Sequence, residues 1–150
     1  ILAASVLLVA SQDRVHSQDA RDRCASIDDI AVAVAAGDAT RLAKVSNRQV
    51  ELDIGEGTKL YSRDQAKYVL ASFFRDHPPA DFALGDAIVV GSTCTARGKF
   101  LSVDSKQGWD AFVMLTMDDQ VWRLRELRFT RAIRVKPQVP SALQPPRGIR

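Results

Sequence analysis

The sequence has few residues that could bind a metal. Its 150 residues include only two cysteines and two histidines, and His16 and His77 lie far apart in the chain. Protein metal sites draw most of their ligands from clusters of such residues. These four residues make no metal site of their own, and we expect neither a metal nor a cofactor.

Long hydrophobic runs are also scarce. The run from Ile1 to Ala10 would rise only about 15 Å as a helix, half the hydrocarbon thickness of a bilayer, so we predict no transmembrane segment. Val15 and Ser17 are small residues at the −3 and −1 positions of a cut before Gln18. This pattern favours a signal peptide over residues 1–17 and export to the periplasm or beyond. The alternative is a short buried helix or strand.

Two cysteines permit a single disulfide. In an exported protein Cys24 and Cys94 would be in an oxidising compartment. A bond between them would stabilise the fold by about 4 kcal/mol in the chain-entropy model. The alternative is a pair of separate buried thiols that act as small hydrophobes. The sequence leaves both open.

Acidic residues are missing from the C-terminal end. The six basic residues from Arg128 onward carry +6 and the whole chain only +3, so the residues before them carry −3. Residues 135–150 hold four prolines and no periodic pattern, which predicts a basic, disordered tail. Such a tail could bind anionic surfaces through nonspecific attraction, but we expect no specific nucleic-acid partner.

The rest of the chain predicts one domain over residues 27–134, after a short linker at 18–26. Ser26 is the expected N-cap of a helix that ends at Gly37, and Asp38 can cap a second short helix, giving a helical hairpin. Residues 50–54 alternate apolar and polar residues as a half-buried strand does, and residues 59–61 are the expected return strand.

Residues 62–76 give the clearest helical signal in the chain. Ser62 followed by Gln65 is a capping-box pattern, and apolar residues then recur at helical spacing. Pro78 and Pro79 bar any continuation beyond His77.

Four strand-like runs follow, over residues 81–91, 92–103, 109–119 and 120–131. Short polar breaks between them predict antiparallel hairpins. In the last run the apolar positions change phase near Arg125 and Glu126, which predicts a β-bulge that bends the strand. The fold class is therefore α+β, with a strongly curved antiparallel sheet around a long helix.

Several stretches of the chain resemble one known family. "DIAVAVAAGDATRLAKV", "VELDI", "YSRDQAKYVLASFFRDHPP", "ARGKF" and "WRLRELRF" look like the successive motifs of a small secreted bacterial family known only as a domain of unknown function. That family lies within the nuclear transport factor 2-like superfamily, whose cystatin-like cone packs a long helix into a curved sheet. The resemblance covers residues 27–131. It implies the fold and a pocket between helix and sheet, and carries over no catalytic residue.

We assign no catalytic residue from the sequence. The candidates to line the implied pocket are Tyr68, Phe73, Trp109, Phe112, Trp122, Arg125 and Glu126. The bulge re-aims Arg125 and Glu126, although a cross-strand salt bridge is the commoner fate of such a pair. The aromatic residues could equally form core or a dimer interface.

Three functions remain open. The favoured one is a non-enzymatic envelope domain that binds a small apolar ligand or a protein partner and forms a homodimer through its sheet. The second is an isomerase- or cyclase-like enzyme, since the wider superfamily includes both. Its candidate acid–base residues are Asp53, Asp86, Asp110, Glu126, Tyr61, Tyr68 and Arg125. The third is an anionic-surface binder that works through the tail.

Overall fold

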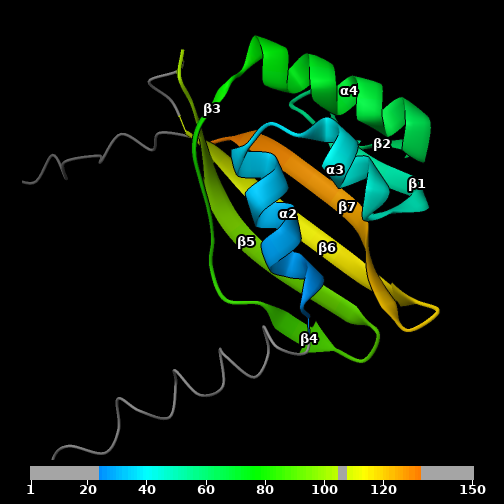
Figure 1. Cartoon of the computed structure of the whole chain (residues 1–150). Coiled ribbons are helices and arrows are strands. Elements are labelled where there is room, and N and C mark those ends of the chain that lie inside the picture. Colours follow the sequence, from blue (N-terminus) through cyan, green and yellow to red (C-terminus); the bar gives the residue numbers. More distant parts are fainter. Residues whose placement is uncertain (1–23, 105–107, 133–150) are drawn as a thin grey trace, which may run out of the picture.

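The chain folds as a curved mixed β-sheet with helices on one face (Figure 1). A computed structural model describes residues 24–104 and 108–132, so the predicted signal peptide and the predicted basic tail lie outside the described residues. In chain order the elements are α2 (Ser26–Ala35), α3 (Ala39–Lys44), β1 (Ser46–Asp53), β2 (Lys59–Ser62), α4 (Arg63–Asp76), β3 (Pro79–Leu84), β4 (Ile88–Val90), β5 (Thr93–Ser102), β6 (Trp109–Asp118) and β7 (Val121–Arg131).

The N-terminal hairpin of helices begins one residue earlier than predicted. Ala25 is the N-cap of α2 and gives no side-chain cap, whereas Ser26 already belongs to the helix. The described residues begin at Cys24, within the range 18–26 that was predicted as a linker. Gly37 takes the left-handed conformation (φ 63°) after α2, and the Asp38 carboxylate accepts a hydrogen bond from the Arg41 amide at 2.8 Å to cap α3.

The sheet order is β2-β1-β7-β6-β5-β3, with β4 also paired to β5. The β5-β6 and β6-β7 pairs are antiparallel, as predicted. The expectation of a wholly antiparallel sheet is wrong, because β1 and β7 pair in parallel. The predicted strand over 81–91 is two strands, β3 and β4, which pair in turn with β5.

Helix α4 matches its sequence prediction. The Ser62 hydroxyl accepts from the Gln65 amide, and the Gln65 side chain accepts from the Ser62 amide, so both halves of the capping box are present. The buried stripe of α4 consists of Ala66, Leu70, Phe73 and Phe74. At the other end, the His77 amide donates to the Phe73 carbonyl at 2.7 Å, and β3 begins at Pro79.

The predicted bulge in the last strand is confirmed. Met114 on β6 pairs with Glu126 and the next residue, Leu115, pairs with Leu124, so Arg125 is left without a partner across the β6-β7 ladder. Because of this extra residue, Arg125 and Glu126 both point away from the core, and Leu124 and Leu127 both point into it.

The core lies between the helices and one face of the sheet, here called the inner face. Trp109, Ala111, Val113 and Leu115 of β6 alternate with less buried residues, as expected for a strand with one covered side. The opposite side, here called the outer face, is the side away from the described helices (Figure 1).

The structure joins Cys24 and Cys94 by a disulfide, with the two Cα atoms 6.4 Å apart. Both residues are fully buried, so the bond ties the chain just before α2 to the inner face of β5. None of the described helices is both long and apolar enough to span a membrane.

Candidate functional site

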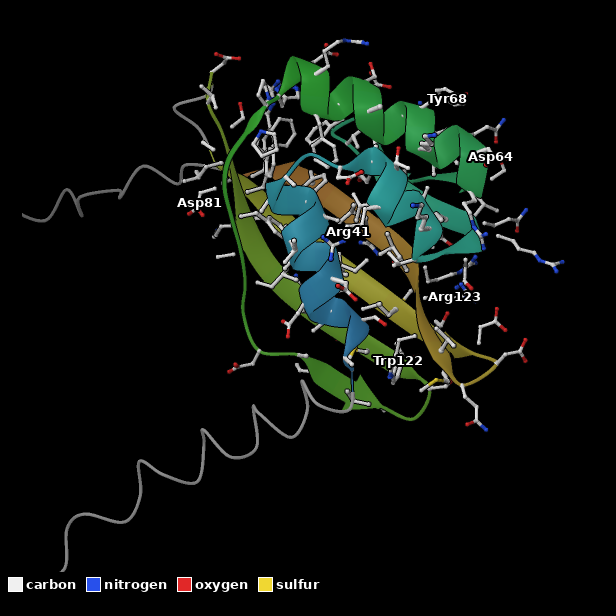
Figure 2. The ribbon with its side chains drawn as sticks, viewed as in Figure 1. Arg41, Asp64, Tyr68, Asp81, Trp122 and Arg123 are labelled. Carbon is white, nitrogen blue, oxygen red and sulfur yellow. A yellow bond between two sulfur atoms is a disulfide. The ribbon has the colours of Figure 1, made fainter. Side chains whose placement is uncertain are left out.

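The residues predicted to line one pocket lie on three different surfaces. Tyr68 is 73% exposed on the solvent side of α4 (Figure 2). Phe73, Trp109 and Trp122 are buried on the inner face, with Trp122 at the end of the sheet beneath the start of α2. Phe112, Arg125 and Glu126 belong to the outer face. Among these residues, Phe73 and Trp109 contact each other with ring centroids 5.6 Å apart, and Phe112 and Glu126 both contact Arg128.

Aromatic rings occupy the space between α4 and the sheet. Phe73 stacks on Phe129 with ring centroids 4.9 Å apart. Phe73 also meets Trp109 edge-on, with ring centroids 5.6 Å apart. His77 lies beside this pair, 5.0 Å from the Phe73 ring and 5.2 Å from that of Trp109. Phe74, Phe82 and Phe100 complete the cluster. The rings make a packed core at the place where the resemblance implied a pocket.

The candidate acid–base residues do not converge. Asp53 accepts hydrogen bonds from the amides of Gly55 and Gly57 in the turn after β1. Asp86 is exposed in the loop between β3 and β4, and Asp110 forms an ion pair with Lys99. Among the carboxylates of residues 24–104 and 108–132, only that of Glu126 belongs to a buried residue, and it lies on the outer face.

Two rows of side chains cross the outer face. In the first row, Arg97, Phe112 and Arg128 are direct cross-strand neighbours on β5, β6 and β7. The guanidinium groups of Arg97 and Arg128 lie 5.3 and 5.0 Å from the centre of the Phe112 ring. A ring between two cations is attracted to both through its quadrupole. The second row runs through Ile88, Thr95, Met114, Glu126 and Glu51.

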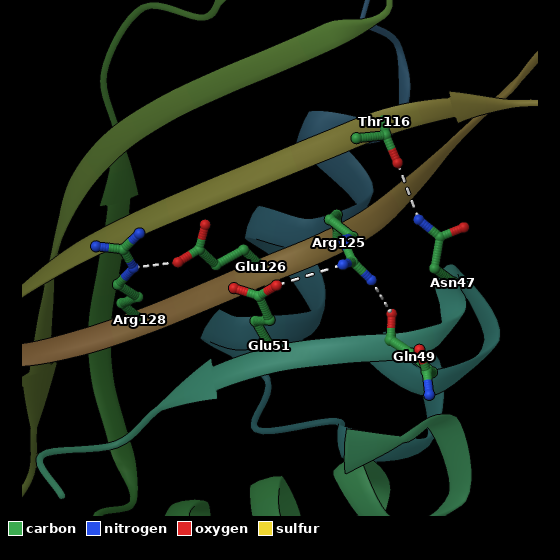
Figure 3. A network of polar contacts seen from close by, with 7 residues as sticks. All are labelled: Asn47, Gln49, Glu51, Thr116, Arg125, Glu126 and Arg128. Atoms are coloured by element: carbon green, nitrogen blue, oxygen red, sulfur yellow. Dashed lines mark hydrogen bonds and ion pairs between the residues drawn. The ribbon is translucent and has the colours of Figure 1, made fainter. Parts of the chain in front are cut away.

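Ion pairs hold the arginines around the bulge (Figure 3). Arg125 donates to the Glu51 carboxylate at 3.3 Å and to the Gln49 carbonyl, also at 3.3 Å. The Arg128 Nε donates to Glu126, whose side chain is only 5% exposed. This hydrogen bond raises the pKa of Arg128 despite partial desolvation, and the charges of Glu126, Asp53 and Glu51 add to the rise. Arg128 therefore stays cationic.

Two hollows open on either side of this network. The hollow of about 460 Å³ lies where β1 leaves the register of β7 and is here called the bulge hollow. It is lined by Asn47, Arg48, Gln49, Asp118 and Arg125. The smaller one, of about 180 Å³, is here called the phenylalanine hollow. It is lined by Arg97, Asp110, Ala111, Phe112, Arg128 and Thr130.

The two hollows share one arrangement of charge. Each contains an arginine that is held by a carboxylate, Arg125 in one and Arg128 in the other. Each also contains an arginine, Arg48 or Arg97, that has no carboxylate within 4.0 Å among residues 24–104 and 108–132. Such guanidinium pairs can bind a carboxylate or another oxyanion.

Sequence analysis missed most of this network. Arg48, Arg97 and Glu51 were not singled out, and Arg128 was counted only among the basic residues of the C-terminal end, because their importance depends on which strands pair and in what register. The outward position of Arg97 could have been found from the sequence, because apolar Cys94 and Ala96 alternate there with polar Thr95 and Arg97. No three metal-ligating side chains cluster within the part of the chain that the structure describes.

Comparisons with known proteins agree with the fold. A family model described as "Domain of unknown function (DUF4783)" matches residues 27–129. A DUF4783 structure from Bacteroides uniformis has a TM-score of 0.66 at 14% identity, over 71% of this chain and 97% of that one. Another, from Bacteroides fragilis, has a TM-score of 0.63 at 15% identity, over 69% and 96%.

A structure from Silicibacter pomeroyi, described as an NTF-2 like protein of unknown function, has a TM-score of 0.53 at 13% identity. It covers 83% of this chain and 100% of that one. No curated protein matches the chain. At these identities the solved structures carry information on fold alone.

Proposed function

This chain belongs to the DUF4783 family, a domain of unknown function with a nuclear transport factor 2-like fold. Since the family description gives no function, we propose one from the residues of this chain. The proposal is an exported, non-catalytic domain that docks on another protein through the outer face of its sheet. The observation that carries it is the position of Phe112, which is half-buried between two arginines and alternates along β6 with the buried inner-face residues Ala111 and Val113.

The packing of the inner face favours a protein partner over a small apolar ligand. A ligand between α4 and the sheet would have to displace rings such as Phe73 and Phe129, which stack at 4.9 Å. Displacing packed core side chains costs several kcal/mol, about as much as deleting them. The outer face requires no such rearrangement.

The distribution of carboxylates favours docking over acid–base catalysis. Glu126 is hydrogen-bonded to Arg128 and Asp110 is paired with Lys99. A general base must be free to accept a proton within hydrogen-bond reach of a substrate. Both carboxylates are engaged by cations, which supports a role in placing the arginines.

The disulfide supports export, because such bonds persist mainly in oxidising compartments. The predicted signal peptide at residues 1–17 agrees with this, and periplasmic or extracellular localisation remains part of the proposal.

Photocrosslinking from both faces of the full-length protein tests the proposal. A photoreactive amino acid replaces Phe112 in one variant, Thr130 in a second and Tyr68 in a third, each expressed in the native cells. We expect a defined protein adduct from the two outer-face positions and none from Tyr68, which is exposed on α4. Adducts from Tyr68 alone, or no adduct from either outer-face position, would overturn the docking function.

A homodimer through the sheet is a special case of this function and was the partner predicted from the sequence. Light scattering of the purified protein at several concentrations distinguishes it. A concentration-dependent doubling of mass that is lost in Phe112→Ala and kept in Tyr68→Ala would identify the partner as a second copy.

A further inference from the structure

We propose that the bulge hollow and the phenylalanine hollow together recognise an acidic segment of the partner protein, with each hollow accepting one carboxylate. This inference rests on the docking function proposed above and names the chemistry of the partner. Its basis is the surplus of one cation in each hollow.

The surplus in the bulge hollow is Arg48. The other charged residues there already have partners, since Arg125 lies 3.3 Å from Glu51 and Asp118 lies 3.9 Å from Arg123. The Asn47 side chain donates to the Thr116 hydroxyl at 2.9 Å, so it helps to fix the wall of the hollow. A carboxylate that enters would meet two guanidinium groups and one net positive charge.

The phenylalanine hollow repeats this arrangement with Arg97 as the surplus cation. Arg128 is paired with Glu126, and Asp110 is paired with Lys99. Glu126 fixes the Arg128 guanidinium through its Nε, so less side-chain entropy is lost when that group binds a ligand. Phe112 adds an apolar surface beside the charges, and such a mixture suits a protein side chain.

One short segment can reach both hollows. Arg125 and Arg128 line different hollows and are three residues apart on β7, which corresponds to about 10 Å along a strand. Ile88, Thr95 and Met114 lie in the adjoining row and could contact apolar residues between the two acids.

The charge pattern distinguishes an acidic protein segment from the alternatives. A nucleic acid or an anionic bilayer is bound mainly through many surplus cations, whereas the carboxylates in and beside these hollows neutralise all but Arg48 and Arg97. In a second copy that docked by the same surface, the carboxylates of the hollows and of their ion pairs, Glu51, Asp110, Asp118 and Glu126, already have cationic partners.

Fluorescence anisotropy with the purified full-length protein tests this inference. The probes are labelled synthetic peptides of alternating Glu and Val, and of alternating Gln and Val, because alternation places all the polar side chains on one side of an extended segment. We expect the Glu peptide to bind about tenfold more tightly at low salt. Arg48→Gln and Arg97→Gln should each weaken its binding about threefold to fivefold.

The control variant is Arg75→Gln, which removes the same charge from the exposed side of α4. Equal effects of all three substitutions would mean nonspecific attraction and would overturn the inference, as would equal binding of the two peptides or binding of neither. Phosphatidylglycerol vesicles and heparin serve as competing probes. If Arg48→Gln and Arg97→Gln weakened vesicle or heparin binding as much as peptide binding, the preference for an acidic protein segment would be wrong.

Crosslinking from Phe112 separates the two proposals. A defined adduct without any discrimination between the Glu and Gln peptides would keep the docking function and reject the acidic segment. If there were neither a defined adduct nor a preference for the Glu peptide, both the docking function and the acidic segment would be rejected.

Discussion

The inner and outer faces of the sheet differ in chemistry although the same strands build both. On the inner face of β6 and β7, Trp109 and Phe129 pack into a cluster of rings under the helices. On the outer face of the same strands, Phe112 lies between Arg97 and Arg128. An aromatic residue therefore has opposite surroundings according to its position in the strand alternation.

Because of this difference, the inner face can stabilise the fold while the outer face is available for recognition. Apolar surface that is removed from water stabilises the fold by about 25 cal/mol per Å², so the inner face provides most of the free energy of folding. Ion pairs that stay partly exposed add little. Charged residues on the outer face can therefore serve binding without a large effect on the free energy of unfolding.

The largest expected effect comes from the inner cluster. Phe129→Ala should lower the free energy of unfolding by about 4 kcal/mol, because this fully buried ring stacks on Phe73 and would leave a cavity. Phe112→Ala is the matched substitution on the outer face and should cost about 1 kcal/mol, since its ring is half-buried. Urea denaturation measures both. Similar losses would mean that the two faces contribute equally to stability.

The disulfide should have the next largest effect. Replacing Cys24 and Cys94 together by Ser should lower the free energy of unfolding by about 3 kcal/mol, because the bond closes a long loop and ties the start of α2 to β5. Unfolding the native protein in the presence of a reductant should also lower its free energy of unfolding, whereas the reductant should not change the double variant. A loss below about 1 kcal/mol would show that the helices hold the inner face without the bond.

The sequence predicted the parts of this fold that depend on local patterns. The capping box at Ser62 and Gln65 is a contact within one turn, and the bulge at Arg125 appears as a change of phase within one strand. The parallel pairing of β1 with β7 could not be predicted in this way. It joins segments about 75 residues apart, as the contact of Arg125 with Glu51 shows, and no hairpin fixes its register.

The state of the interior was also beyond local patterns. The sequence identified Phe73 and Trp109 as facing the space between helix and sheet, but whether side chains fill that space depends on the distance between α4 and the strands. Similarly, Arg97 becomes significant only once β5 is placed beside Phe112 in the correct register. The periodicity of apolar residues along the chain does not determine such distances between elements.

A smaller effect is expected from the buried carboxylate of the outer face. Glu126→Gln should lower the free energy of unfolding by about 1 to 2 kcal/mol, because it removes a buried charge that pairs with Arg128. The effect stays moderate since the Arg128 side chain is 44% exposed and can be solvated by water. Asp110→Asn changes the exposed pair with Lys99 and should cost less than about 1 kcal/mol. Equal losses in the two variants, measured by thermal or urea unfolding, would mean that burial of Glu126 has no energetic consequence.

The smallest expected effect is the coupling between Glu51 and Arg125. Both side chains are 34% exposed, so a double-mutant cycle of Glu51→Gln and Arg125→Gln should give about 0.5 kcal/mol. The coupling should fall further in 1 M salt, because ions screen partly exposed charges. A value that small would leave the pair free to orient a guanidinium toward the bulge hollow at little expense of stability. A coupling above about 2 kcal/mol would instead mean that the pair is one of the main interactions that hold β1 to β7. The outer face would then also stabilise the fold, at the strand pair that the sequence did not predict, and the division between a stabilising inner face and a recognising outer face would be wrong.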